Sequence, residues 1–264
     1  MCNRSLETHD WIYEDLASQE YKQAISSKVD EQREERYEHL TESQFFQVKD
    51  LLVEFSDCLF VDGAKPSTID HYHFDIELKS GTVPVRHQLP KRSPYEQSRE
   101  QFHIRKAESL GHLIIPEHID KSDWATRTHI VHKKDDPNGR WICDFRPLNL
   151  ATLKRATPIG DVPSKARQLA SRVWKTALDA WSGFNQMRAT KRAQKLLQVI
   201  TSLGLRQFIV LPFGVTNGPP HFQEMMLDIY GGASMNQSSL LDFAMVDVAG
   251  YLGILMDDLQ LGTG

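Results

Sequence analysis

The sequence has 264 residues, of which 40% are hydrophobic and 25% are charged, and its formal net charge is −4 at pH 7. This composition is close to that of an ordinary globular domain and excludes collagen-like, mucin-like and wholly disordered chains. No run approaches the roughly 18 apolar residues that span a membrane, and the N-terminus has no apolar segment typical of a secretory signal. Because the three cysteines are also widely spaced, we expect an intracellular protein, cytoplasmic or nuclear.

The charges are distributed unevenly along the chain. Residues 1–80 carry a net charge of −10, residues 81–210 carry +12, and residues 211–264 carry −6 without any lysine or arginine. A basic block of this size favours a polyanionic partner. The acidic region after it favours a site that holds a cation.

The first 92 residues are expected to precede the main domain. Residues 1–57 are polar and rich in charge, and FFQVKDLLVEF near their end has apolar residues at helical spacing, so they are interpreted as an acidic helical leader. The simplest interpretation of this leader is a solvated helix without a function of its own. Residues 58–92 contain the alternating run HYHFDIEL, typical of a strand, and then a basic, proline-rich stretch that resembles a linker leading into the rest of the chain.

A helix and a hairpin open the main domain. Ser93 is expected to cap a helix that begins at Pro94. Two β-rich runs, THIVHKK and RWICDF, flank the turn-forming sequence DDPNG and predict a hairpin. Asn138 and Gly139 favour the left-handed turn conformation, so Lys133 and the lysine after it are expected at the hairpin tip.

Further helices and strands are predicted in the C-terminal half. A short helix is expected from Pro163 to about Ser171, and VWKTALD is a strand that ends on Asp179. LLQVITSLGLRQFIVLPFG predicts a second hairpin, PPHFQEMMLDIY predicts a helix, and GYLGILMDDLQLGTG predicts a hairpin with Asp257 and Asp258 at its bend. Separate hairpins and helices, without regular βαβ alternation, indicate the α+β fold class.

Asp179, Asp257 and Asp258 are candidate metal ligands. If the strands that carry them are neighbours in one sheet, their carboxylates converge, and such a cluster is costly unless a cation neutralises it. Magnesium prefers oxygen ligands, and two such ions can activate a 3′-hydroxyl and stabilise a leaving pyrophosphate. Together with the basic block, this pattern predicts a metal-dependent nucleotidyl transferase. A purely structural role stays open, because acidic pairs are common at turns.

Several blocks of the sequence, in the same order, resemble the reverse transcriptase region of Gypsy-type LTR-retrotransposon polyproteins. The most specific block is LPFGVTNGPPHFQ, which is similar to the family's LPFGLTNAPATFQ, and LMDDLQLG resembles its YxDD hairpin. SDWATRTHIVHKKDDPNGRWICDFRPLN resembles the fingers hairpin, and ALDAWSGFNQM resembles the strand with the first metal-binding aspartate. The resemblance covers roughly residues 45–264. It implies a right-hand polymerase, with fingers and palm in residues 93–264, that copies RNA or DNA into DNA.

The resemblance also implies roles for individual residues. The catalytic ligands of two Mg²⁺ or Mn²⁺ ions would be Asp179, Asp257 and Asp258. Contacts to the incoming deoxynucleoside triphosphate would come from Lys133, Arg140, Phe184, Phe213 and Gly214. Contacts to the RNA or DNA template and its primer would come from Gln223 and Met256. Phe184 would be the steric gate that excludes a ribose 2′-hydroxyl, although a core aromatic is the alternative. Asp144 and Arg146 are expected to form an ion pair that braces the fingers.

Three departures from the family pattern bear on activity. The family's WRxCVDYR is shortened to RWICDF, so the arginine after the tryptophan is missing, and Arg140 is the candidate substitute. Leu255 replaces the tyrosine of YxDD. The sequence ends six residues after Asp258, so we expect a polymerase truncated before the thumb. Two alternatives therefore stay open: an inactive remnant that only binds nucleic acid, and an interaction protein that acts through its acidic leader. Neither a membrane nor a particular protein partner is predicted.

Overall fold

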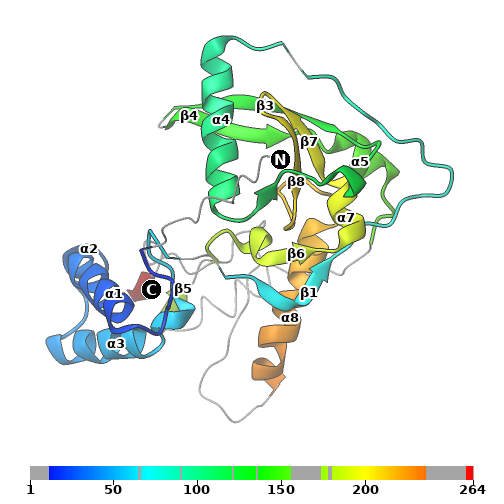
Figure 1. Ribbon diagram of the computed structural model, residues 1–264. Helices are drawn as coiled ribbons and strands as arrows, with labels where there is room; N and C mark the ends of the chain where they lie inside the picture. The colour runs from blue at the N-terminus through cyan, green and yellow to red at the C-terminus, as the bar shows by residue number, and fades with distance from the viewer. Residues whose placement is uncertain are drawn as a thin grey trace. The chain divides into compact units, whose positions relative to one another are not determined.

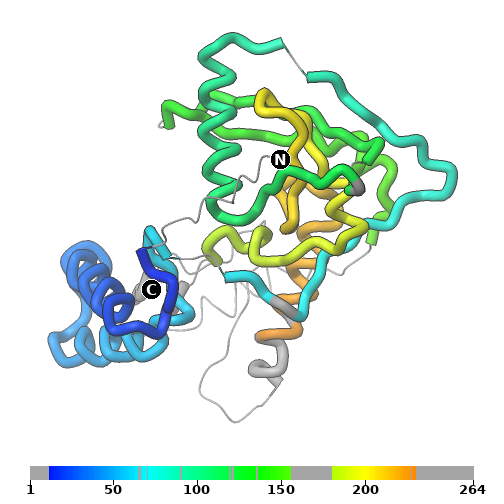
Figure 2. Tube along the Cα trace, viewed as in Figure 1, coloured from blue at the N-terminus to red at the C-terminus, as the bar shows by residue number. Residues whose placement is uncertain are grey.

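The structure is a computed structural model (Figure 1, Figure 2), and it describes residues 12–64, 67–89, 91–120, 122–134, 136–155, 174–177, 180–235 and 260–263. The described residues divide into two compact units, one within Met1–Lys65, Ile159–Gly183 and Ser239–Gly264 and the other within Pro66–Pro158 and Phe184–Ser238. The helix expected from Pro163 lies outside the described residues. Within them, no helix has the length and apolar character needed to cross a membrane. The predicted domain boundaries after residues 57 and 92 stay predictions.

Three helices form the N-terminal part of the first unit: α1 (Gln19–Glu31), α2 (Arg33–Arg36) and α3 (Glu42–Glu54), followed by the 3-10 turn η1 (Ser56–Cys58). Ser18 caps α1, and Thr41 caps α3 in a capping box. The prediction of helices here is confirmed. The picture of a single solvated helix is wrong, because the apolar residues form a hydrophobic core of their own. Its buried members are Tyr21, Ile25, Val29, Tyr37, Phe45, Leu59 and Ala64.

The first unit also contains two short strands from distant parts of the sequence. β5 (Trp174–Ala177) pairs antiparallel with β9 (Gln260–Thr263), and Ala177 lies opposite Gln260. The pairing confirms the strand predicted in VWKTALD over its described part. It also confirms that this strand is a neighbour of the segment that follows the Asp-Asp pair.

A five-stranded sheet forms the centre of the second unit, in the strand order β2-β8-β7-β3-β4 (Figure 1). Its strands are β2 (Leu113–Ile114), β3 (Thr126–Lys133), β4 (Asp136–Cys143), β7 (Gln198–Thr201) and β8 (Gly204–Phe208). Neighbouring strands are antiparallel except β3 and β7, which are parallel. Both predicted hairpins, β3–β4 and β7–β8, are confirmed. A separate parallel pair consists of β1 (Ile69–Phe74), the strand expected in HYHFDIEL, and β6 (Met187–Ala189).

The helix predicted after Ser93 is confirmed as α4 (Pro94–Ser109), which packs against β4 (Figure 1). Ser93 and Glu96 form a capping box, in which each side chain accepts a hydrogen bond from the other residue's backbone N–H. The helix ends before Gly111, whose φ of +67° is the left-handed conformation expected at a helix stop. The remaining helices among the described residues are η2 (His118–Asp120), α5 (Arg146–Ala151), η3 (Gly183–Gln186), α7 (Lys191–Leu196) and α8 (Gly218–Met235), the last of which was predicted.

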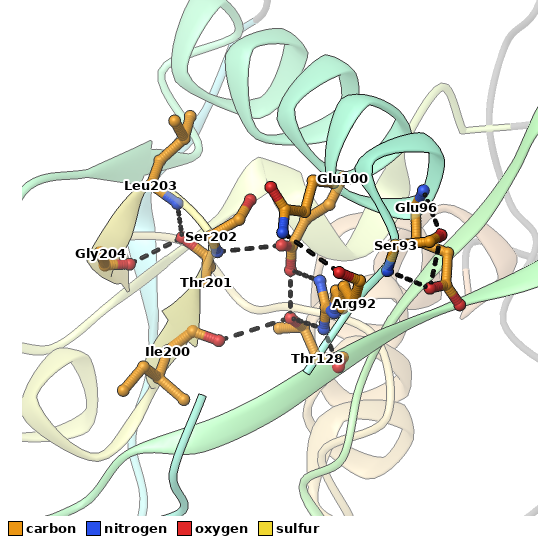
Figure 3. A network of polar contacts seen from close by, with 11 residues as sticks. Arg92, Ser93, Glu96, Glu100, Thr128, Ile200, Thr201, Ser202, Leu203 and Gly204 are labelled. Atoms are coloured by element: carbon orange, nitrogen blue, oxygen red, sulfur yellow. Dashed lines mark hydrogen bonds and ion pairs between the residues drawn. The ribbon is translucent and has the colours of Figure 1, made fainter. Parts of the chain in front are cut away.

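A buried polar network ties α4 to three other segments of the second unit (Figure 3). Glu100 on α4 is fully buried and pairs with Arg92, whose side chain is 6% exposed. Its carboxylate also accepts hydrogen bonds from the Thr128 hydroxyl on β3 and from the Ser202 backbone N–H between β7 and β8. Burial raises the pKa of the Glu100 carboxyl, but these hydrogen bonds outweigh burial and leave the pKa lowered. Because Arg92 belongs to the stretch that resembled a linker, this stretch is part of the folded unit.

The hairpin β3–β4 turns earlier than the sequence predicts. Lys133 pairs with Asp136, so the turn lies between them, and Asn138 and Gly139 are already within β4. The pairing register shifts between Val131 and Lys133, and Gly139 has a φ of +66° at this irregularity. A Cβ atom on Gly139 would lie 2.5 Å from the Val131 carbonyl oxygen, so a larger residue does not fit there. The expected left-handed conformation is present, but it forms a bulge and not the turn.

Candidate functional site

The hairpin β3–β4 carries two of the predicted nucleotide-binding residues. Lys133 stands at the end of β3 next to the turn, as expected, and Arg140 lies on β4 opposite Val131. Both cationic residues are exposed. On β3, Thr126 and Thr128 are buried, whereas the alternate residues Arg127, His129 and Val131 are exposed. Arg140 and its partner Val131 therefore share the solvent-facing side of the hairpin. A phosphate group can approach Arg140 there without desolvating a buried charge.

Asp144 follows β4 and is held by two arginines. Its carboxylate accepts hydrogen bonds from Arg146 Nε at 2.6 Å and Nη2 at 2.8 Å, and from Arg127 Nε at 3.0 Å. The hydrogen bonds from Arg146 above all, with those from Arg127, hold the pKa of the Asp144 carboxyl well below its usual range. The expected ion pair is therefore confirmed, with Arg127 as a further partner. It connects the base of the hairpin to the start of α5.

Two of the predicted pocket residues lie side by side in a cluster of aromatic rings. The Phe184 ring centroid lies 5.2 Å from that of Phe213 and 5.3 Å from that of Phe222 on α8. Phe184 is 6% exposed, whereas Phe213 is 54% exposed. The structure thus brings Phe184 and Phe213 together and leaves part of the Phe213 ring open to solvent. The buried Phe184 ring also contributes to the core of the second unit.

Gly214 and Gln223 adjoin this cluster in the sequence. Gly214 follows Phe213 in an exposed segment and has a φ of +91°, a left-handed conformation that favours glycine. The nearest atoms to a Cβ there would be 3.9 Å away, so the backbone conformation and not lack of space requires glycine. Gln223 follows Phe222 on α8 and is 7% exposed. Its role near the template stays a prediction.

The candidate metal ligands Asp179, Asp257 and Asp258, together with Met256, lie outside the described residues. Their flanking strands are described: β5 ends two residues before Asp179, and β9 begins two residues after Asp258. Among the described residues, no group of three or more histidine, cysteine, aspartate or glutamate side chains is arranged to hold a metal ion. The described residues therefore offer no alternative to the predicted magnesium site, which stays a prediction.

Two contacts next to predicted residues were not anticipated from the sequence. In the first unit, Phe60 stacks on Trp181, with ring centroids 3.8 Å apart and an interplanar angle of 17°. In the second unit, the Asn149 side chain binds the backbone of Gly214 and of Thr216. Phe60 stands near the acidic leader, and no local pattern pairs it with a tryptophan some 120 residues later. Asn149 is part of the family-like block DFRPLN, which could have drawn attention to it.

Comparisons with known proteins find relatives among retrotransposon polyproteins. No protein-family model matches the chain. Over 205 residues it is 27% identical to the retrovirus-related Pol polyprotein from transposon 297 of Drosophila melanogaster, covering 74% of this chain and 18% of that protein. It is 29% identical over 114 residues to the corresponding polyprotein from the Drosophila melanogaster transposon gypsy, covering 41% and 11%. It is 34% identical over 90 residues to an RNA-directed DNA polymerase homolog of Oenothera berteroana, covering 34% and 63%.

A solved structure shares the fold. A foamy viral protease-reverse transcriptase in complex with an RNA/DNA hybrid matches with a TM-score of 0.66 and 18% identity, over 92% of this chain and 33% of that one. The fold is therefore that of retroviral reverse transcriptases. The homologues of the chain are retrovirus-related Pol polyproteins of transposons, which confirms the resemblance to Gypsy-type elements. The chain spans less than a fifth of these two polyproteins, 18% and 11% of their lengths.

Proposed function

We propose that the chain provides the fingers and palm of a retrotransposon reverse transcriptase, an RNA-directed DNA polymerase that adds deoxynucleotides to a primer 3′-hydroxyl. The observation that carries this proposal is the pairing of β5 with β9, because these strands adjoin Asp179 and Asp258 in the sequence. The homologous Pol polyproteins and the shared fold support it. The chemistry would be nucleotidyl transfer assisted by two metal ions.

The register of the β5–β9 ladder supports the convergence of the aspartates. Ala177 lies opposite Gln260, and an antiparallel ladder moves forward by one residue on one strand and back by one on the other at each step. Two further steps in the same register would pair Asp179 with Asp258. Opposite residues in such a ladder have Cβ atoms about 4.5–5.5 Å apart. Two carboxylates at that separation repel each other unless cations neutralise them.

Asp179, Asp257 and Asp258 would hold two Mg²⁺ or Mn²⁺ ions, since carboxylate oxygens are the ligands that these ions prefer. When bound, the ions would supply Lewis-acid activation of the primer 3′-hydroxyl and stabilisation of the leaving pyrophosphate. The aspartates themselves would fix the positions of these charges. Residues 211–264 carry a net charge of −6 and no lysine or arginine, which fits a region that binds cations.

Arg140 is well placed to supply the arginine that the shortened hairpin was expected to lack. In the family pattern WRxCVDYR the arginine stands four residues before the aspartate, and Arg140 stands four residues before Asp144. Counted from the aspartate, it is the tryptophan that stands at a different position than in the family pattern. In the structure, Trp141 stacks on Phe208, with ring centroids 5.9 Å apart. We propose that Arg140 and Lys133 bind the incoming triphosphate from the solvent-facing side of the hairpin.

The aromatic cluster and the segment after it would complete the nucleotide pocket. The Phe184 ring would exclude a ribose 2′-hydroxyl, and the exposed part of Phe213 would contact the nucleotide. Gly214, without a side chain, would let the nucleotide approach the backbone closely. Gln223 and Met256 would contact the RNA or DNA template and its primer.

Primer extension tests this proposal. The full chain is given a DNA primer on an RNA template, deoxynucleoside triphosphates, and Mg²⁺ or Mn²⁺. The variant Asp257→Asn/Asp258→Asn is expected to lose about 100-fold or more of the incorporation rate, because it removes carboxylates that hold the ions. The matched control Asp50→Asn/Glu54→Gln removes the same charge from exposed positions of α3 and should extend primers at the unaltered rate. Equal rates for the wild-type chain and the Asp257/Asp258 variant would refute the assigned mechanism.

The exposed basic side of the hairpin also supports a second function, binding of nucleic acid without catalysis, because Lys133 and Arg140 can bind phosphates without Asp179, Asp257 and Asp258. Such a remnant would bind an RNA/DNA hybrid with an affinity that falls steeply as salt rises, and it would incorporate no nucleotide. Retained salt-dependent binding by a folded chain that does not extend primers would favour this alternative.

A further inference from the structure

Asn149 holds the backbone segment that contains Gly214. Its side-chain Nδ2 donates to the Gly214 carbonyl oxygen at 2.8 Å, and its Oδ1 accepts from the Thr216 N–H at 2.9 Å. A neighbouring strand would bind the same two backbone groups, one on each side of a central residue. We infer that Asn149 is a positioning residue for the segment Phe213–Thr216, and hence for the nucleotide pocket.

Among the described residues, Asn149 makes the hydrogen bonds on both sides of Val215, whose own side chain is buried. Other backbone hydrogen bonds hold Leu211, whose N–H donates to the Met187 carbonyl, and Val215, whose carbonyl accepts from the Gly218 N–H. Between these points the described residues offer the backbone of Phe213, Gly214 and Thr216 no hydrogen bond besides those of Asn149. The left-handed φ of Gly214 makes the segment a sharp bend, so its direction depends on what holds it.

The anchor connects the segment to the hairpin that carries Arg140. Asn149 lies on α5, and its backbone N–H donates to the Phe145 carbonyl at 2.8 Å. Phe145 follows Asp144, whose carboxylate is bound by arginines on both sides of the hairpin base. The Asn149 amide therefore sets the distance between the hairpin base and the Phe213–Thr216 segment.

Asn149 fixes the geometry of the Phe213–Thr216 segment and contributes little to the overall stability of the unit. Its side chain is only half-buried and its hydrogen bond to Gly214 is exposed, so water can replace its partners at little net cost. Loss of the amide should therefore let the segment move while the unit stays folded. Because Phe213 packs on Phe184, movement of the segment would also change the surroundings of the proposed steric gate.

The structural part of this inference, that Asn149 holds the segment Phe213–Thr216, does not depend on the proposed function. Its consequence for the nucleotide pocket does rest on that function. The structural part is tested first, by hydrogen exchange of the full chain without any nucleotide. In Asn149→Ala the Thr216 amide should exchange about tenfold faster or more, since its only acceptor among the described residues is removed. In Asn149→Asp the amide should stay protected, because one carboxylate oxygen still accepts from it. Unchanged exchange in Asn149→Ala would overturn the inference whether or not the chain is a polymerase.

The matched control is Thr152→Val, which lies close by at the end of α5. Its hydroxyl donates to the Leu148 carbonyl at 2.7 Å and makes no contact with residues 213–216 among the described interactions. This variant removes a buried hydrogen bond of the same helix without touching the segment. Protection of the Thr216 amide should be the same as in the wild-type chain. Equal loss of protection in both variants would show that any weakening of α5 frees the segment, and would overturn the specific role of Asn149.

Kinetics test the consequence for the pocket. Asn149→Ala and Asn149→Asp should each raise the KM for deoxynucleoside triphosphates about five- to tenfold, with a smaller change in kcat, and should weaken discrimination against ribonucleotides. Asn149→Asp belongs in this group because its second oxygen would face the Gly214 carbonyl oxygen and repel it. Neither variant should lower Tm by more than about 4 °C. Faster exchange in Asn149→Ala with an unchanged KM in an active enzyme would overturn the role in the pocket, whereas an inactive wild-type chain would count against the proposed function instead.

Discussion

Two carboxylates of the second unit, Glu100 and Asp144, each bind arginine side chains, but their surroundings differ. Glu100 is fully buried, and the side chain of its partner Arg92 is only 6% exposed. Asp144 is also buried, yet the side chains of Arg127 and Arg146 are 49% and 77% exposed. One cluster is therefore enclosed in the protein, while the other presents its positive charges to solvent.

This difference indicates what each cluster does. Removing one partner of an enclosed pair leaves an unpaired buried charge, so the Glu100 network is needed for the fold of the unit. Removing Asp144 leaves two arginines that water can solvate, so the same change there costs less. The enclosed cluster joins α4, β3 and the β7–β8 turn (Figure 3). The open cluster lies at the base of the hairpin that presents Arg140, where exposed cations can also meet phosphates.

The largest effect should come from Glu100→Ala. The change leaves Arg92 as an unpaired buried cation and removes the acceptor for the Ser202 N–H and the Thr128 hydroxyl. We expect a loss of about 3–5 kcal/mol in the free energy of unfolding. Urea unfolding followed by circular dichroism measures this loss. If the loss is below about 1 kcal/mol, the enclosed cluster contributes no more to stability than an exposed surface ion pair does.

A double variant sharpens this result. Arg92→Met/Glu100→Gln removes both charges, while the glutamine still accepts from the Ser202 N–H or the Thr128 hydroxyl. It should recover most of the stability lost in Glu100→Ala, because no buried charge is left without a partner. A double variant as unstable as Glu100→Ala would mean that shape and packing, and not the unpaired charge, cause the loss.

The contrast between the two clusters also marks how far the sequence could predict the structure. The open cluster was predicted as an Asp144–Arg146 ion pair, since both residues stand in one family-like block. The cap at Ser93, both hairpins and the strand before Asp179 were predicted too, because capping boxes and hairpins depend on residues close in sequence. The candidate metal ligands Asp179, Asp257 and Asp258 rest on spacing and resemblance alone and stay a prediction.

Contacts between distant segments could not be predicted. Arg92 stands in a basic, proline-rich stretch where an arginine is normally solvated, and nothing local indicates that it is buried against Glu100. The same holds for Phe60 and Trp181, whose rings stack across distant parts of the sequence. The turn of the hairpin was misplaced because Asn-Gly is typical both of turns and of bulges, and the register that decides between them comes from pairing along the whole strand.

A smaller effect is expected at the open cluster. Asp144→Asn keeps the shape of the side chain but removes the charge that Arg127 and Arg146 bind. We expect a loss of about 1–2 kcal/mol in the free energy of unfolding, since hydrogen bonds to a charged group are lost but both arginines stay solvated. The same urea unfolding experiment measures it. A loss as large as that of Glu100→Ala would contradict the view that exposure of the partners sets the cost.

The smallest effect is the pH dependence of the unfolding free energy that Asp144→Asn loses. The arginines hold the pKa of the folded Asp144 carboxyl below its usual range, so the folded state binds this proton less readily than the unfolded state. The stabilisation is therefore fully present above the unfolded pKa of about 3.9 and decreases as pH falls toward the folded pKa. The stability difference between the wild-type chain and Asp144→Asn should accordingly be constant from pH 7 to about pH 5 and should narrow below about pH 4. Urea midpoints of both chains measured from pH 7 to pH 3 provide the test. A difference that stays constant to pH 3 would show that Asp144 contributes through its shape alone, and the open cluster would then not be electrostatic in origin.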